Sequence, residues 1–186
     1  MQAYHIDPVA KTINVVSLLG SPANLATMLN IDVRNLAGSA LNEGPTPDVL
    51  FVADKVVKGL GSFFMINGLP VPVHGDAYIV GVHDALEGHD VGVGQGAETP
   101  TVSLEWVRSN LIWLRPAPDK SHEGMLAFEA CDVSPATVAN VLRGMQAMQE
   151  KGDVRVTGGM GPLDSVDPTE KVDLSDVIKA VTTHLH

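Results

Sequence analysis

Apolar and polar residues in the first half of the chain follow the short period that is typical of strands. Residues 3–6 and 12–18 are rich in apolar and β-branched side chains, and the Asp-Pro between them favours a turn. We therefore expect an opening hairpin. Three later apolar runs predict buried strands, of which the last is the best candidate for a central strand. These runs are residues 49–52, 62–66 and 77–82.

Helices are predicted where a serine stands directly before a proline. A serine hydroxyl caps free N–H groups and proline fits the first turn, so Ser21-Pro22 and Ser134-Pro135 each favour a helix start. The second of these helices has the clearest pattern, because apolar residues recur on one face until Gly152 ends it. Further predicted elements are a short helix and then a strand within residues 102–114, strands at 125–130 and 154–156, and a closing helix at 174–185.

Together these elements predict an α+β fold, with a mainly antiparallel sheet and short helices followed by a C-terminal strand–helix–strand–helix block. Residues 115–120 contain two prolines and several charged side chains, which disfavour both helix and strand and predict a linker. The linker divides the chain into a β-rich core domain at 1–116 and a C-terminal α/β extension at 121–186, packed on the core or continuous with it. A length of 186 residues suits either arrangement.

The charge balance argues against several classes of partner. Twelve Lys and Arg against 22 Asp and Glu give a net charge of −10, and no basic stripe is present, so we expect no nucleic-acid binding. The single cysteine, Cys131, excludes an intramolecular disulfide framework and suits the cytoplasm. The chain shows neither a secretory signal nor an apolar run of about 18 residues, which predicts a soluble protein without a membrane partner.

A long polar, glycine-rich stretch follows the strand at 77–82 and holds a cluster of metal-ligand residue types. Imidazole and carboxylate groups are ligands that divalent transition metals accept, and they make a metal-dependent hydrolase one interpretation of the sequence. The spacing matches no known ligand pattern, and polar loops gather such residues anyway, so we expect neither a metal nor another cofactor. The cluster consists of His83, Asp84, Glu87, His89 and Asp90.

Arginines and a glycine run form a second candidate site. A guanidinium fork suits carboxylates and phosphates, so Arg34, Arg108 and Arg115 are candidates to converge on an anionic ligand. Gly94 and Gly96 would then contribute a loop around it. Isolated arginines more often pair with nearby carboxylates, and the glycines do not lead into a helix as a dinucleotide-binding motif requires. Binding or sequestering of a nucleotide-like anion stays an alternative function.

Nucleophilic chemistry has a single candidate in the sequence. Cys131 stands just before a predicted helix start, where the helix dipole lowers a thiol pKa. A small buried thiol is the commoner role of a cysteine in such a position. The chain has no Gly-x-Ser-x-Gly and no His-Glu-x-x-His motif. We therefore name no catalytic residue, and the sequence favours a protein that is not an enzyme.

Residues 3 to 114 contain a series of ordered packing and turn motifs. In chain order they are AYHIDPVAKTI, SALNEG, VLFVAD, SFFMINGLPVPVHGDAYIVG and PTVSLEWVRSNLIWL. With its Ile-Asp-Pro hairpin, Phe-rich strand, Gly-x-Ala strand and Thr-x-Ser-Leu-Glu segment, the chain resembles an uncharacterised domain family carried by bacteriophages and other mobile elements of bacteria. The resemblance implies an origin and a bacterial host cell. It brings no established reaction to any residue here.

The function that we expect is that of a non-enzymatic phage or mobile-element accessory protein, which binds a host protein or modulates a host process. Its small size, acidic charge and the resemblance favour this hypothesis. The expected partners are a host protein and a second copy of the chain, since a homodimer is the default for such a protein. Anionic-ligand binding and metal-dependent hydrolysis remain the two alternatives.

Overall fold

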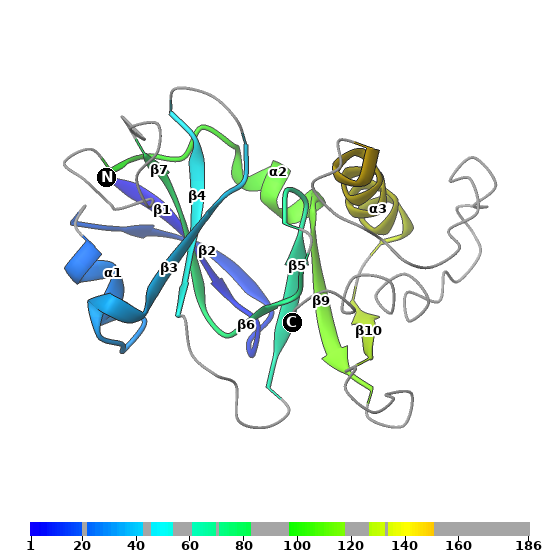
Figure 1. The fold of residues 1–186 in the computed structure, drawn as a ribbon, viewed down its shortest axis with the longest axis horizontal. Coiled ribbons are helices and arrows are strands. Elements are labelled where there is room, and N and C mark those ends of the chain that lie inside the picture. The colour runs from blue at the N-terminus through cyan, green and yellow to red at the C-terminus, as the bar shows by residue number, and fades with distance from the viewer. Residues whose placement is uncertain are drawn as a thin grey trace. The chain divides into compact units, whose positions relative to one another are not determined.

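The computed structural model confirms the α+β class, with mainly antiparallel strands and few helices (Figure 1). Two compact units are present, and each is assembled from two separate stretches of the chain. Unit 1 comprises Met1–Gly59 and His74–Arg108, and unit 2 comprises Leu60–Val73 and Ser109–His186. The structure describes residues 1–19, 22–42, 46–53, 61–69, 71–82, 97–117, 127–132 and 134–150.

Unit 1 contains a six-stranded antiparallel sheet with the order β2-β1-β7-β4-β3, to which β8 adds by pairing with β7. The predicted central strand is confirmed, because β7 lies between β1 and β4 and all its residues are buried. The strands are β1 (Gln2–Asp7), β2 (Thr12–Ser17), β3 (Leu36–Ala40), β4 (Asp48–Ala53), β7 (Ala77–Val82) and β8 (Ala97–Glu98). The helices are α1 (Pro22–Met28), the short 3-10 helix η1 (Val33–Asn35) and α2 (Leu104–Ser109), whose last residue belongs to unit 2.

The opening hairpin forms as predicted, with β1 and β2 paired from Gln2↔Ser17 to Asp7↔Thr12. A side chain organises its turn. The Asp7 carboxylate accepts hydrogen bonds from the backbone N–H groups of Val9 and Ala10, both at 2.9 Å. Lys11 then takes a left-handed conformation with φ at 54°, which turns the chain into β2.

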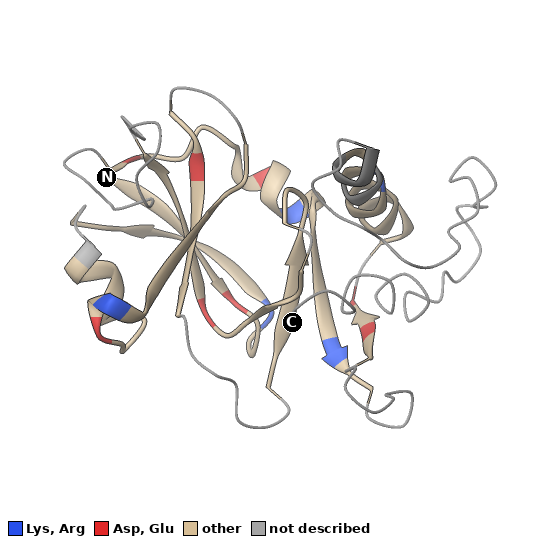
Figure 2. Cartoon of the chain, viewed as in Figure 1, with Lys and Arg blue, Asp and Glu red and all other residues tan. Residues whose placement is uncertain are grey.

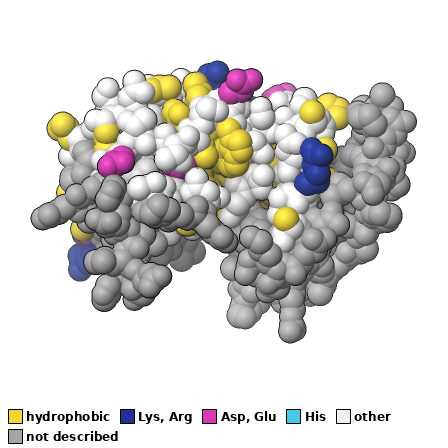
Figure 3. All heavy atoms as spheres, turned by 90° about the horizontal axis from the view of Figure 1, so that it is seen from above, with side chains coloured by type: hydrophobic (Ala, Val, Ile, Leu, Met, Phe, Trp, Pro, Cys, Tyr) yellow, Lys and Arg dark blue, Asp and Glu magenta, His cyan; other side chains and the backbone are white. Residues whose placement is uncertain are grey.

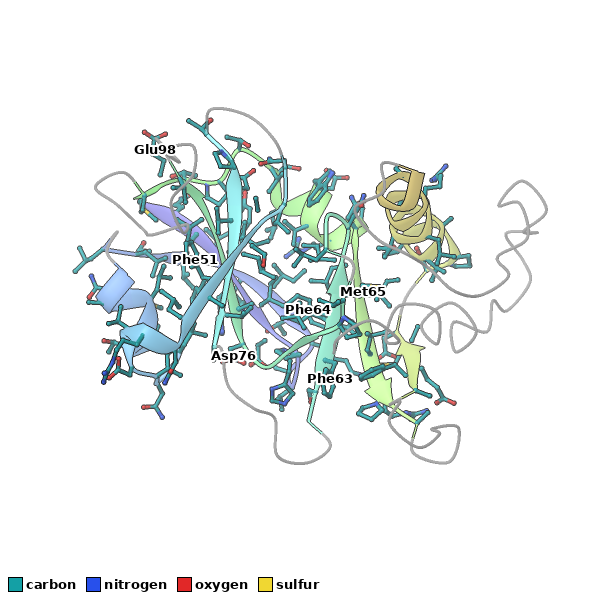
Figure 4. The ribbon with its side chains drawn as sticks, in the orientation of Figure 1. Phe51, Phe63, Phe64, Met65, Asp76 and Glu98 are labelled. Carbon is teal, nitrogen blue, oxygen red and sulfur yellow. The ribbon has the colours of Figure 1, made fainter. Side chains whose placement is uncertain are left out.

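One hydrophobic cluster of unit 1 lies on one face of the sheet, where α1 contributes Leu25. Figure 4 shows Phe51 inside this unit. Gly38 stands opposite Phe51 on the neighbouring strand, and a Cβ at this glycine would lie 2.9 Å from the Phe51 ring. The glycine therefore makes room for the ring. The buried residues of this cluster are Ala3, Leu18, Leu25, Val49, Phe51, Tyr78, Val80 and Val82.

Unit 2 holds a second antiparallel sheet with the order β10-β9-β5-β6. Its core is more aromatic, because Phe63 packs edge-on against Phe128 with ring centres 4.8 Å apart. The predicted cap of the long helix is confirmed, since Ser134 Oγ accepts a hydrogen bond from Thr137 N at 3.1 Å. The elements are β5 (Phe63–Ile66), β6 (Val73–His74, whose second residue belongs to unit 1), β9 (Leu111–Pro116), β10 (Phe128–Cys131) and α3 (Pro135–Glu150).

The two compact units cut across the division predicted from the sequence at 116–121. The linker prediction is wrong for Arg115 and Pro116, because β9 includes both residues and pairs there with β10; β5 pairs with β9 as well. Local composition marks a break in regular structure, but it carries no information on which distant strands pair. The strand predicted at 154–156 and the helix predicted at 174–185 lie outside the described residues.

Candidate functional site

Arg34, the first of the arginines predicted to bind an anion, is paired with its neighbour Asp32. The Nε and Nη2 atoms of Arg34 each donate to one carboxylate oxygen of Asp32 at 3.1 Å. The same carboxylate caps η1 by accepting from the Arg34 backbone N–H at 2.9 Å. The Arg34 side chain lowers the pKa of Asp32, with the backbone bond as a further cause, and Asp32 raises the pKa of Arg34. The guanidinium fork is thus already occupied.

The other two arginines lie on different elements. Arg115 of β9 stands opposite Glu129 of β10, and its Nη2 lies 2.7 Å from Glu129 Oε2. Arg108 is exposed in the last turn of α2. Figure 2 shows how sparsely Lys and Arg occur on the described elements. Within unit 1, Arg34 lies on η1, which packs against α1, and Arg108 lies on α2, so their convergence on one anion stays a prediction.

The predicted metal cluster and glycine run lie in a part of the chain that the structure does not describe, so both stay predictions. Among the residues that are described, no group of three or more His, Cys, Asp or Glu side chains could hold a metal ion. The predicted residues outside the described ranges are His83, Asp84, Glu87, His89, Asp90, Gly94 and Gly96.

Cys131 closes β10 in unit 2 and is half-buried. It stands opposite Trp113 of β9, and its Sγ donates a hydrogen bond to the Trp113 carbonyl at 3.5 Å. The thiol thus adds a weak cross-strand bond next to the backbone pairing of β9 and β10. This contact agrees with the structural role that is common for cysteine.

A polar cluster that sequence analysis missed lies at the start of β7, where Figure 4 labels Asp76. The His5 ring stacks on Tyr78 with centroids 4.7 Å apart, and His5 Nε2 lies 3.4 Å from Asp76 Oδ2. Burial raises the pKa of Tyr78, and the negative charge of Asp76 raises it further. The strand period was the available signal, because Asp76 and Tyr78 are two residues apart and face the same way. The cluster holds β1 against β7.

A strongly hydrogen-bonded polar side chain of unit 1 is Asp48, the first residue of β4, which is 0% exposed. Its carboxylate accepts backbone N–H bonds from Thr101 at 2.8 Å and Val102 at 2.9 Å. The hydroxyl of Thr101 donates to it at 2.6 Å, and the side-chain amide of Asn42 at 2.9 Å. These neutral donors compensate the buried charge. Asp48 therefore ties the two stretches of unit 1 together just before α2.

Unit 2 has an analogous contact made of amides. Asn67 donates through Nδ2 to Asn110 Oδ1 at 3.2 Å and through its backbone N–H to the Asn110 carbonyl at 2.9 Å. Helix α3 meets this pair at Gly144, where a Cβ would overlap the Asn67 amide. One turn earlier, Asn140 Nδ2 donates to the Ser109 carbonyl at 3.2 Å. The predicted Asn67-Gly68 turn is confirmed, because Gly68 has φ at 97°. The contact between Asn67 and Asn110 was not predicted from the sequence.

The exposed apolar side chains of unit 1 fall within one stretch of its sequence. Among the described residues, all the large hydrophobic side chains that are exposed fall between residues 9 and 33. Figure 3 shows one face of the molecule, on which few of the described side chains are charged. The exposed residues and their exposed fractions are Val9 76%, Val15 48%, Leu19 81%, Met28 42% and Val33 49%.

Comparison of the chain with protein-family models, with curated proteins and with solved structures finds no match. The resemblance to a mobile-element family therefore stays a prediction. In the described part of the chain, no helix has the length and apolar character needed to cross a membrane.

Proposed function

We propose that the chain is a non-enzymatic accessory protein of a phage or mobile element, which acts in the bacterial cytoplasm by binding a host protein. The observation that carries the proposal is the exposure of three large hydrophobic side chains around α1 and η1, namely Leu19, Met28 and Val33. An apolar surface concentrated in one part of a folded unit is typical of a protein interaction site. The resemblance of residues 3–114 supports the origin.

The centre of the proposed binding surface is the segment around α1 and η1. Leu19, Met28 and Val33 supply its apolar contacts, and we call these residues the α1 surface. The segment is held by its own bonds: Asn24 Nδ2 donates to the Leu19 carbonyl at 2.7 Å, and η1 packs against α1. The exposed Asp32–Arg34 pair adds a charged rim. An apolar centre with a polar rim is the usual anatomy of a protein interface.

The chemistry of the partner follows from the surface and from the charge. Apolar groups on the α1 surface require apolar groups opposite them. The net charge of −10 favours a partner that carries Lys and Arg around its contact site, because opposite charge steers encounter and excludes other acidic proteins. We therefore expect a basic host protein with a small apolar patch.

The test compares two charge substitutions one residue apart in α1. Met28→Glu places a charge in the α1 surface, whereas Thr27→Glu adds the same charge at an exposed polar position. Tagged full-length protein is incubated with host lysate, and captured proteins are quantified by mass spectrometry. A partner that the wild type and Thr27→Glu capture should be lost at least about tenfold with Met28→Glu.

A thermal unfolding measurement of each variant accompanies the capture. If Met28→Glu keeps its melting temperature and still captures every partner at the wild-type level, the α1 surface does not bind the host protein. If neither the wild type nor Thr27→Glu enriches any protein from several hosts, the proposed function itself is overturned.

A further inference from the structure

Hydrogen-bonded and non-bonded residue pairs alternate along the opening hairpin, and this alternation shows which backbone groups of β2 point away from β1, toward the open edge of the sheet. Met1 and Leu18 exchange both backbone bonds, at 2.9 and 3.2 Å, and form a hydrogen-bonded pair. Hydrogen-bonded and non-bonded pairs alternate along an antiparallel ladder. The N–H and C=O groups of Ile13, Val15 and Ser17 therefore point away from β1.

These outward groups lie at an edge of the sheet, since β2 pairs only with β1 among the described residues. Proteins usually protect such an edge with charged side chains, proline or a bulge. Residues 12–17 contain no charged residue and no proline, and their register with β1 is continuous. Val15, at the middle of the strand, is 48% exposed. The edge is thus well suited to pairing with another uncharged strand.

We propose that β2 pairs antiparallel with β2 of a second copy of this chain, so that the two unit 1 sheets join into one continuous sheet. The two-fold axis passes through Val15. Val15 then exchanges both backbone bonds with the Val15 of the other copy, and Ile13 does so with Ser17. This interaction goes beyond the proposed host-protein binding and uses a different surface.

The positions of the outward backbone groups along β2 select this register from the alternatives. An axis between two residues would place an outward residue opposite an inward one, so that few bonds form. An axis through Asn14 would bring Ser17 opposite Lys11, which is in the left-handed turn, and an axis through Val16 would bring Ile13 opposite Leu19, beyond the strand. Only an axis through Val15 pairs all the outward residues within β2.

The other edge strand, β3, is less suited to this pairing. Its sequence, LAGSA, presents small side chains and a glycine, and α1 packs beside it. No large hydrophobic side chain of β3 is exposed. A charged substitution on β3, Ser39→Lys, therefore serves as the matched control for one on β2.

The first experiment is sedimentation velocity of the full chain over a concentration series. We expect a monomer–dimer equilibrium for the wild type and for Ser39→Lys. Val15→Lys should raise the dissociation constant at least about tenfold, because it sets two like charges opposite each other across the axis. Val15 makes no backbone hydrogen bond to β1, so the melting temperature of this variant should stay close to that of the wild type. A monomeric wild type, or a dimer that only Ser39→Lys dissociates, would overturn the proposal.

Disulfide trapping then tests the register, in a Cys131→Ser background that removes the native thiol. Opposite residues of a hydrogen-bonded pair have Cα atoms about 5.5 Å apart, within the range of a disulfide. Val15→Cys should therefore give a cross-linked dimer on mild oxidation. Asn14→Cys should not, because its copy lies diagonally across the axis, about 7–8 Å away or more. Equal cross-linking of the two variants would refute the register.

The tests of the two proposals are distinguishable. Met28→Glu should dimerise as the wild type does, and Val15→Lys should retain the host partner. If Met28→Glu abolishes the dimer, the second copy binds the α1 surface and the β2 pairing is wrong.

Discussion

Units 1 and 2 meet the same structural requirement with different polar groups. Each unit is assembled from two stretches of the chain, and in each a polar side chain at the end of a strand binds the other stretch. In unit 1 the carboxylate of Asp48 gathers bonds from Asn42, Thr101 and Val102. In unit 2 the Asn67–Asn110 amide pair makes fewer bonds and relies on its fit against Gly144. The stabilising energy of the Asp48 contact is concentrated in one carboxylate. That of the Asn67–Asn110 contact is spread over the packing around the two amides.

The largest effect is expected from Asp48→Ala, which removes the charged tie. Several buried donors would lose their acceptor at once, and an unsatisfied buried donor costs about 1–3 kcal/mol. We expect the free energy of unfolding to fall by about 3 kcal/mol or more, measured by urea denaturation. Thr101→Val, which removes only the hydroxyl bond, should cost about 1 kcal/mol. Equal losses for the two variants would show that the energy is not concentrated in the carboxylate.

Gly144→Ala tests the neutral tie and should have the next largest effect. In an ordinary helix this change stabilises, because alanine restricts the unfolded chain and favours the helix. Here the added Cβ overlaps the Asn67 amide, so we expect a loss of about 1–3 kcal/mol in urea denaturation. Combining it with Asn67→Ala should restore much of the loss, since the overlap is then gone. If Gly144→Ala stabilises the protein, α3 does not pack against the Asn67 amide.

A smaller effect, with a defined pH dependence, is expected from the Tyr78 cluster of unit 1. Folding raises the pKa of Tyr78 above its ordinary value of 10.0, so the unfolded chain loses the phenol proton first. Stability should therefore be unaffected below that pH and fall as the pH rises above it. Asp76→Asn should lower the pKa of Tyr78, as followed by phenolate absorbance in a Tyr4→Phe background. An unchanged titration would remove Asp76 from the causes of the shift.

Arg115→Ala should give the smallest effect, although its bond to Glu129 is as short as 2.7 Å. The Arg115 side chain is 71% exposed, and water and salt screen such a pair. We expect a loss below about 1 kcal/mol in urea denaturation, which shrinks further at high salt. A loss comparable to that of Asp48→Ala would contradict the distinction between buried and exposed ties.

The sequence predicted local features well and long-range partners poorly. The hairpin, the central strand β7 and the Ser134 cap follow from residues that are close in the chain. The tie at Asp48 depends on residues 53 and 54 positions away, and only the presence of a carboxylate at the start of an apolar strand hints at it. The pairing of Arg115 with Glu129 likewise depends on the register of β9 and β10, which no local pattern encodes.

The interleaved order of the two units bears on how the chain is made by the ribosome. Strand β5, with Phe63, Phe64, Met65 and Ile66 all destined for burial, is synthesised before its partner β9 exists. During that interval the chain completes the second stretch of unit 1, so an apolar segment stays without its partner β9 while another sheet closes. Nascent chains arrested near residue 110 should therefore need a chaperone that full-length chains do not. Because β5 is exposed until β9 has been made, the speed of translation between these two strands should affect the yield of folded protein.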